Sequence, residues 1–121
     1  MESIENKEFE QSIVVGINTG NDILFNYQFN ETISLCEALD IEVVDTLTQN
    51  LPHPNTATYL GKGKLDELKE LILHYDVNLV IFNDDLSPIQ LRNITDFLEV
   101  EVLDRTMLIL EIFKIRAKTK E

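Results

Sequence analysis

Short apolar runs alternate along the chain with longer stretches in which apolar residues recur every three or four positions. The short runs are rich in β-branched residues and end in polar or turn-forming residues, a pattern typical of strands buried in a sheet. Strands are therefore predicted at 11–17, 41–47, 78–82 and 101–103. The recurring spacing marks one apolar face of a helix. Helices are predicted at 27–40, 65–75, 88–98 and 106–121.

The alternation of strands and helices predicts the fold class. Because each strand is followed by one helix, the helices can cross over the sheet and leave the strands parallel. We therefore expect an α/β fold, a small doubly wound parallel four-stranded sheet with helices on both faces and the strand order 2-1-3-4. The fully apolar strand 78–82 belongs in the middle of such a sheet. Ligands and partners are expected at the loops beyond the carboxyl ends of the strands.

Two helix starts carry local signals. Ser87, Pro88 and Gln90 match a capping box with proline at the first helical position, where the missing N–H has no intrahelical partner to lose. Asp104 or Thr106 is expected to supply the capping oxygen of the last helix. Arg105 would then be free to reach outward and bind a phosphate or a carboxylate, with ordinary solvation as the alternative.

The last predicted helix, 106–121, is apolar nearly all round, whereas a helix with one face in water should show a polar side. One side is expected to pack on the sheet and the other on a partner outside the domain. In the isolated chain the same apolar stripe would favour self-association. The residues expected to make these contacts are Leu108, Ile109, Ile112, Phe113 and Ile115.

The 121 residues are enough for one domain with a substantial core. We expect a flexible acidic N-terminus at 1–10, an α/β domain at 11–105, and the start of a C-terminal helix at 106–121. No stretch approaches the roughly 18 apolar residues of a membrane span, and the start of the chain does not resemble a secretory signal. A cytoplasmic protein with no membrane partner is predicted. The single Cys36 falls on an apolar helix position and is expected to be a packed, reduced thiol.

The net charge of −12 argues against a nucleic-acid partner, but the charges are unevenly distributed. Residues 1–60 hold one basic residue against ten acidic residues, whereas residues 61–121 hold nine against twelve. The bases of the second half fall at or beside the junctions between strands and helices, so one edge of the domain could be locally positive. The alternative is that they are ordinary solvated side chains. The candidates for binding an anionic partner are Lys62, Lys64, Arg92, Arg105 and Arg116.

The segment Gly61-Lys62-Gly63-Lys64 invites a phosphate-binding interpretation, because lysine and the free amides at a helix N-terminus attract anions. It departs from a Walker loop, which needs a glycine at the position of Thr58 and a hydroxyl ligand for Mg²⁺ at the position of Leu65. Two interpretations remain. The segment is either a weak phosphate loop or a tight turn whose lysines face water.

Asp84 and Asp85 follow the third predicted strand, where carboxylates can hold Mg²⁺ or favour the positive end of the next helix. The first strand ends without an acidic pair to complete such a metal site. His53 and His74 have no second ligand at the spacing that zinc requires. We assign no catalytic residue and no metal ligand.

Three stretches in the second half, taken in order and spacing, resemble the N-terminal domain of HflX-type ribosome-associated GTPases. The stretches are Gly61–Lys64, Leu86–Asn93 and Asp104–Phe113, and the resemblance runs from about Pro54 to Glu121. Ile89 and Met107 depart from the smaller residues expected at their positions.

This resemblance implies the accessory module of a GTPase that associates with the large ribosomal subunit and acts in ribosome splitting or rescue under stress. Its partners would be ribosomal RNA and protein, together with the helical linker and the GTP-binding domain of its own full-length protein. GTP and Mg²⁺ would be bound by that further domain. No cofactor and no GTP hydrolysis are expected of this chain. The alternative is an α/β domain that binds a nucleotide at Gly61–Lys64.

Overall fold

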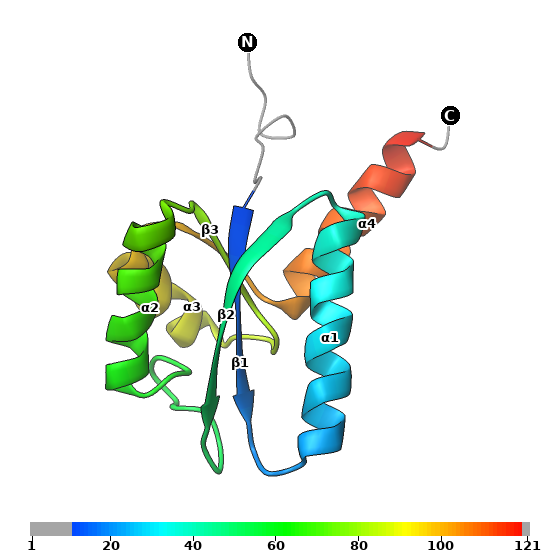
Figure 1. Cartoon of the computed structure of the whole chain (residues 1–121). Helices are drawn as coiled ribbons and strands as arrows, with labels where there is room; N and C mark the ends of the chain where they lie inside the picture. Colours follow the sequence, from blue (N-terminus) through cyan, green and yellow to red (C-terminus); the bar gives the residue numbers. More distant parts are fainter. Residues whose placement is uncertain (1–10, 120–121) are drawn as a thin grey trace.

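The computed structural model describes the backbone of residues 11–119 and the side chains of residues 11–115. Strands and helices alternate along this part of the chain (Figure 1). The elements are β1 (Gln11–Asn18), α1 (Asp22–Ala38), β2 (Glu42–Asn50), α2 (Lys62–Tyr75), β3 (Leu79–Phe82), α3 (Pro88–Leu98), β4 (Glu101–Leu103) and α4 (Arg105–Thr119). The acidic segment 1–10 and the side chain of Arg116 lie outside the described residues.

The four strands form one parallel sheet in the order β2-β1-β3-β4. This confirms the predicted fold class and strand order. The two central strands pair directly, with Ile13 opposite Val80. All four residues of β3 are buried, as its apolar sequence predicted. Parallel strands buried on both faces need a helical layer on each side.

The helices supply these two layers: α2 and α3 cover one face of the sheet, and α1 and α4 cover the other (Figure 1). Successive side chains of a strand point to opposite faces, so neighbours in β1 and β3 enter different cores. Between the sheet and α2 with α3 lie, among others, Val15, Val80, Leu68 and Ile94. Between the sheet and α1 with α4 lie, among others, Val14, Ile81, Phe29 and Leu108.

Both predicted helix caps are present. The hydroxyl of Ser87 accepts a hydrogen bond from the Gln90 amide at 3.1 Å, and the Gln90 side chain accepts one from the Ser87 amide at 2.9 Å. At the start of α4, the Asp104 carboxylate accepts from the Met107 amide at 3.0 Å. Each cap satisfies amides that the first turn of a helix leaves without partners.

Two helices begin earlier than predicted. α1 starts at Asp22 rather than Tyr27, because the Asn21 side chain caps it by accepting from the Leu24 amide at 3.0 Å. α2 starts at Lys62 rather than Leu65. Neither added turn carries a fully buried side chain, and only Phe25 of α1, which is half-buried, packs against the core, so the apolar periodicity is weak in both turns.

Cys36 lies on the core-facing side of α1 and is fully buried, as predicted, and its burial raises the pKa of the thiol to about 12. The reactive thiolate is therefore almost absent at neutral pH in the folded chain. We expect Ellman's reagent to modify Cys36 very slowly in buffer near neutral pH and rapidly in concentrated urea, as followed by the released chromophore. Rapid modification of the folded chain would contradict this burial.

The same pKa shift predicts how stability depends on pH. Folding favours the protonated thiol, so the contribution of Cys36 is complete below the ordinary thiol pKa of 9.0 and is lost as the pH rises toward about 12.

Candidate functional site

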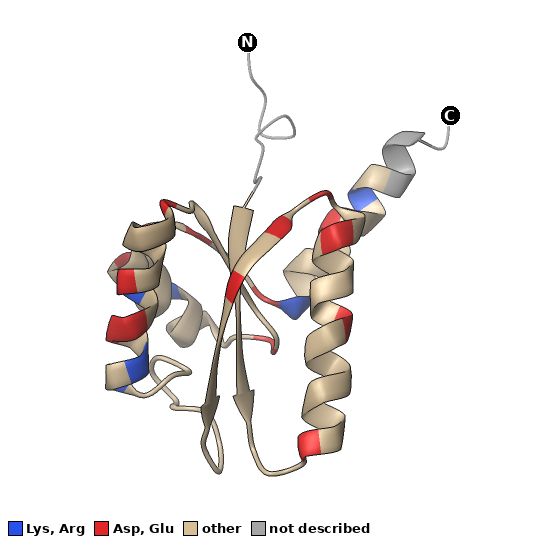
Figure 2. Cartoon of the chain, in the orientation of Figure 1, with Lys and Arg blue, Asp and Glu red and all other residues tan. Residues whose placement is uncertain are grey.

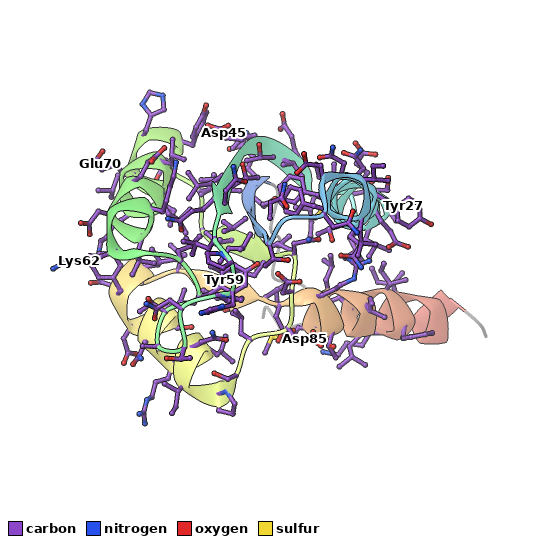
Figure 3. All side chains as sticks on the ribbon, turned by 90° about the horizontal axis from the view of Figure 1, so that it is seen from below. Tyr27, Asp45, Tyr59, Lys62, Glu70 and Asp85 are labelled. Carbon is purple, nitrogen blue, oxygen red and sulfur yellow. The ribbon has the colours of Figure 1, made fainter. Side chains whose placement is uncertain are left out.

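All four helices begin at the edge of the sheet where the strands end, and this carboxyl edge holds the candidate residues. Figure 3 views the chain from that side, with Tyr59, Lys62 and Asp85 around the ends of the strands. At the opposite, amino edge, acidic residues lie where α1 ends and β2 begins (Figure 2). Two connections build the carboxyl edge, namely 51–61 between β2 and α2 and 83–87 between β3 and α3.

The Gly61–Lys64 segment is not a loop, and the expectation of a tight turn was wrong. Gly61 is the N-cap of α2 with φ −64°, and the next three residues already belong to the helix. The Gly61 amide donates to the Gln49 side chain at 3.0 Å, and a Cβ at this position would lie 3.1 Å from the Gln49 Nε2 atom. Glycine is therefore favoured here by the close approach of Gln49 rather than by an unusual backbone angle.

Three of the candidate bases lie in the first two turns of α2 and α3. Lys64 pairs with Glu67 at 3.2 Å, whereas Lys62 and Arg92 are exposed and form no ion pair with any described side chain. No side chain caps the start of α2. A locally positive edge that binds an anionic partner stays a prediction for these bases.

Arg105 is the exception, because its side chain turns inward. One guanidinium nitrogen donates to the Thr32 hydroxyl at 2.7 Å and to the Asn83 side-chain oxygen at 3.2 Å, while the other pairs with Glu31. Thr32 and Asn83 are buried, so the guanidinium ties α4 to α1 and to the end of β3. The expectation that Arg105 reaches outward was wrong, since these partners on α1 were not evident from its own segment.

Tyr59 is the residue at this edge that the sequence did not reveal. Its side chain is 1% exposed and meets the Phe82 ring edge-on, with ring centroids 5.2 Å apart. Its hydroxyl accepts from the Ile17 amide at 3.2 Å and donates to the Asp84 carboxylate. Burial, followed by the charge of Asp84, raises the pKa of Tyr59. The residue also adopts φ +66°, a left-handed conformation unusual for a large side chain.

The connection 51–61, which contains Tyr59, is held in place by hydrogen bonds. Asn55 and Tyr59 exchange backbone hydrogen bonds of 3.0 and 2.9 Å, and the Asn55 side chain accepts from the Ala57 amide at 2.8 Å. Two side chains of α3 donate to backbone oxygens of the connection: Gln90 to Asn55 at 2.7 Å and Asn93 to Ala57 at 3.0 Å. These hydrogen bonds fix the connection to the start of α3.

The acidic residues after β3 are occupied by protein groups. Asp84 accepts from Tyr59, and Asp85 accepts from the amide and hydroxyl of Thr106 at 3.0 and 2.8 Å. The Asp85 carboxylate therefore accepts hydrogen bonds at the N-terminus of α4 and not at that of α3. A search of the described residues found no group of three or more His, Cys, Asp or Glu side chains that could hold a metal ion.

The point at which doubly wound sheets usually bind ligands is filled by side chains here. This point lies between the ends of β1 and β3, where the chain leaves toward opposite faces. On one face the Phe29 ring lies so close to Gly16 that a Cβ there would be 2.9 Å away, and on the other face Tyr59 covers Phe82. An open groove of ≈ 520 Å³ lies elsewhere, beside the edge strand β4, where Asn78 and Glu101 contribute to its walls.

The predicted apolar face of α4 is exposed in part. Leu108 is buried against the sheet and belongs to the core, so it is not available to a partner. Ile112 is half-buried. Further around and along the helix, Ile109, Phe113 and Ile115 are exposed, Phe113 to 58%. An exposed apolar stripe of this kind is typical of a contact surface.

Comparison with known proteins gives a consistent family assignment. The family model described as "GTP-binding GTPase N-terminal" matches residues 26–114. A GTPase HflX from Lacrimispora saccharolytica is 40% identical over 99% of this chain, and GTPase HflX from Escherichia coli is 34% identical over 93% of it. The chain spans 29% and 26% of the length of these two relatives.

A solved structure agrees with the sequence comparison. The crystal structure described as the complex of SsGBP and GDP has a TM-score of 0.71 and 25% sequence identity, covering 91% of this chain and 31% of that one. The fold, the family model and the relatives point to the same assignment. The chain belongs to the GTP-binding GTPase N-terminal family, as the N-terminal domain of an HflX-type GTPase.

Proposed function

We propose that this domain is the accessory binding module of a GTP-binding protein that associates with the large ribosomal subunit, in ribosome splitting or rescue under stress. The observation that carries the proposal is the match of nearly the whole chain to about 29% of relatives named GTPase HflX. In the proposed protein, GTP and Mg²⁺ are bound by a further GTP-binding domain, and the present domain contributes contacts to ribosomal RNA and protein.

Within this proposal the domain itself hydrolyses no GTP. The ends of β1 and β3 are filled by Phe29 and Tyr59, which supports this assignment. The start of α2 also lacks the hydroxyl that would hold Mg²⁺, because Leu65 occupies its position and is buried. GTP turnover by the purified 121-residue chain above the rate in buffer would contradict it.

The exposed side of α4 is proposed to pack on the helical linker and the GTP-binding domain of the same protein. Phe113 and Ile109 would be buried there, each contributing about 1.5–3 kcal/mol when fully covered. In the absence of those parts, the same face favours self-association of the domain. Among residues 11–119, no helix combines the length and the apolar character that crossing a membrane requires. A cytoplasmic location is part of the proposal.

Cosedimentation tests the proposed function. We expect the 121-residue chain to pellet with purified large ribosomal subunits at low salt and to leave them as salt increases, because its contacts to phosphate would release counterions. Small subunits serve as the matched control. No cosedimentation with large subunits at low salt, or equal cosedimentation with both subunits, would contradict the proposal.

A second candidate function is nucleotide binding at the start of α2. The uncapped amides of this helix, beside Lys62 and Lys64, favour it. Calorimetric titration of GTP and of ATP into the same chain separates the two functions. Saturable binding that Lys64→Ala weakens would support the second candidate, and the absence of heat would leave the binding module as the function.

A further inference from the structure

β4 is an edge strand whose outer side is open. Within the described sheet it pairs with β3 alone, whereas β1 and β3 each have a neighbour on both sides. The Glu101 amide donates to the Asn78 carbonyl oxygen at 3.1 Å, so the backbone groups of Glu101 face β3. Backbone groups of successive residues point to opposite sides of a strand, and those of Val102 therefore face the open side. Such an edge is a template for pairing with a further strand.

The groove of ≈ 520 Å³ lies along this open side, and we name it the β4 groove. Leu91 and Thr95 of α3 line it from one face of the sheet, and Met107 of α4 lines it from the other. Val100, which precedes β4, and Val102 complete its apolar lining. Leu91, Val100 and Met107 are only half-buried, so each exposes apolar surface to an occupant. Extended peptides bind to such surfaces by pairing with the edge strand and packing alternate side chains beside it.

The β4 groove carries negative charge. Its charged lining residues are Glu99 and Glu101, and no described lysine or arginine lines it. The Glu99 side chain is 78% exposed, and its carboxylate lies 3.8 Å from the Lys69 ammonium, near the limit for an ion pair. Val102 packs in the core beneath α2 and α3 and Leu103 in the other core, so alternation places Glu101 on the face of α1 and α4. An occupant would thus meet apolar surface on the α3 side and a carboxylate on the α4 side.

We propose that the β4 groove binds an extended segment of another protein in which apolar and basic residues alternate. The segment pairs with the Val102 backbone as a fifth strand, packs its apolar side chains against Leu91, and directs its basic side chains toward Glu101. Charge argues against a second copy of this chain as the occupant. Two chains of net charge −12 repel each other, and pairing their β4 edges would bring glutamates together. The contacts of β4 carry this inference, which is independent of the proposed function.

Fluorescence anisotropy measures binding of the 121-residue chain to two labelled synthetic peptides of about ten residues, one alternating valine with lysine and the other alternating valine with glutamate. The lysine peptide is expected to bind saturably, and the glutamate peptide at least about tenfold more weakly. The double variant Glu99→Gln, Glu101→Gln should bind the lysine peptide about fivefold more weakly, because two charge contacts near the surface are lost. The control Glu42→Gln, Glu70→Gln removes the same charge from β2 and α2 and should change the affinity less than about twofold.

Amide hydrogen exchange, followed by NMR, separates strand addition from simple charge attraction. The Val102 N–H faces the open side, so a saturating lysine peptide should slow its exchange at least about tenfold, while the amides of β2 keep their rates. Thr95→Arg places a long basic side chain in the groove and should weaken peptide binding at least about tenfold. Thr48→Arg is the matched control, because it makes the same change at an exposed position of the other edge strand. Urea midpoints check that all variants fold.

Four results would overturn the proposed strand addition. The first is no saturable binding of the lysine peptide up to about 1 mM, and the second is equal affinity for the two peptides. The third is binding that leaves the exchange of the Val102 amide unchanged or that Thr95→Arg and Thr48→Arg weaken equally. The fourth is a dimer of the chain alone, seen by analytical ultracentrifugation, in which the Val102 amide is already protected. The occupant would then be a second copy.

Discussion

Replacing Tyr59 by phenylalanine is expected to lower the free energy of unfolding by about 2–3 kcal/mol. The loss comes from one hydroxyl. It accepts from the Ile17 amide at 3.2 Å, at a point of β1 beyond its last pairing with β3, and it donates to the Asp84 carboxylate. Phenylalanine fills the same space but leaves a buried N–H without an acceptor, and an unsatisfied buried donor costs more than an ordinary hydrogen bond contributes. Urea unfolding followed by circular dichroism measures the change.

Tyr27→Phe is the matched control, because it removes the same hydroxyl from a side chain that is 68% exposed. Its free energy of unfolding should stay within about 0.5 kcal/mol of the unmodified chain. A double-mutant cycle of Tyr59→Phe with Asp84→Asn separates the carboxylate from the Ile17 amide. If Tyr59→Phe were as stable as Tyr27→Phe, the hydroxyl would not hold the end of β1 in the way described.

The order of the elements and the sheet could be predicted because their signals are local. The four apolar residues of β3 are enough to predict that the strand is buried. The capping box of α3 is complete within Ser87 to Gln90. Right-handed crossovers then leave few ways to arrange four strand and helix pairs. The strand order followed from these rules and needed no information about contacts between distant residues.

The helix boundaries were harder, because in the missed turns no side chain is fully buried and only Phe25 packs against the core. In the first turns of α1, Ile23 and Tyr27 are apolar or aromatic but largely exposed, which breaks the periodicity. In α2, the two glycines of Gly61–Lys64 lower helix propensity, and no side-chain cap marks the start. The spacing of apolar residues could therefore locate the middle of each helix but not its beginning.

The site was predicted as an edge of the sheet and not as a set of contacts. The partners of Tyr59 lie 25 and 42 positions away along the chain, and the Arg105 guanidinium meets α1 residues more than 70 positions away. No local pattern reports such contacts. A large aromatic residue near the end of a polar connection is the one sequence feature that could have pointed to Tyr59.

Replacing Arg105 by methionine is expected to lower the free energy of unfolding by about 2 kcal/mol, and Arg105→Lys by about half as much. Methionine keeps much of the length of the side chain but removes every donor, so Thr32 and Asn83, both buried, lose their charged partner. Lysine has a single ammonium group, which cannot reach these two oxygens and Glu31 together as the planar guanidinium does. Urea unfolding of the two variants measures both changes.

Arg92→Met is the matched control, since it removes an exposed guanidinium without an ion pair among the described side chains, and its unfolding should change by less than about 0.5 kcal/mol. A cycle of Arg105→Met with Glu31→Gln should give a coupling below about 1 kcal/mol, because Glu31 is half-exposed and its pair is screened by water. Most of the loss must then come from the buried oxygens, and it should persist in high salt. If Arg105→Met and Arg92→Met lowered the free energy of unfolding equally, the Arg105 guanidinium would be solvated. Arg105 would then be available to bind a partner.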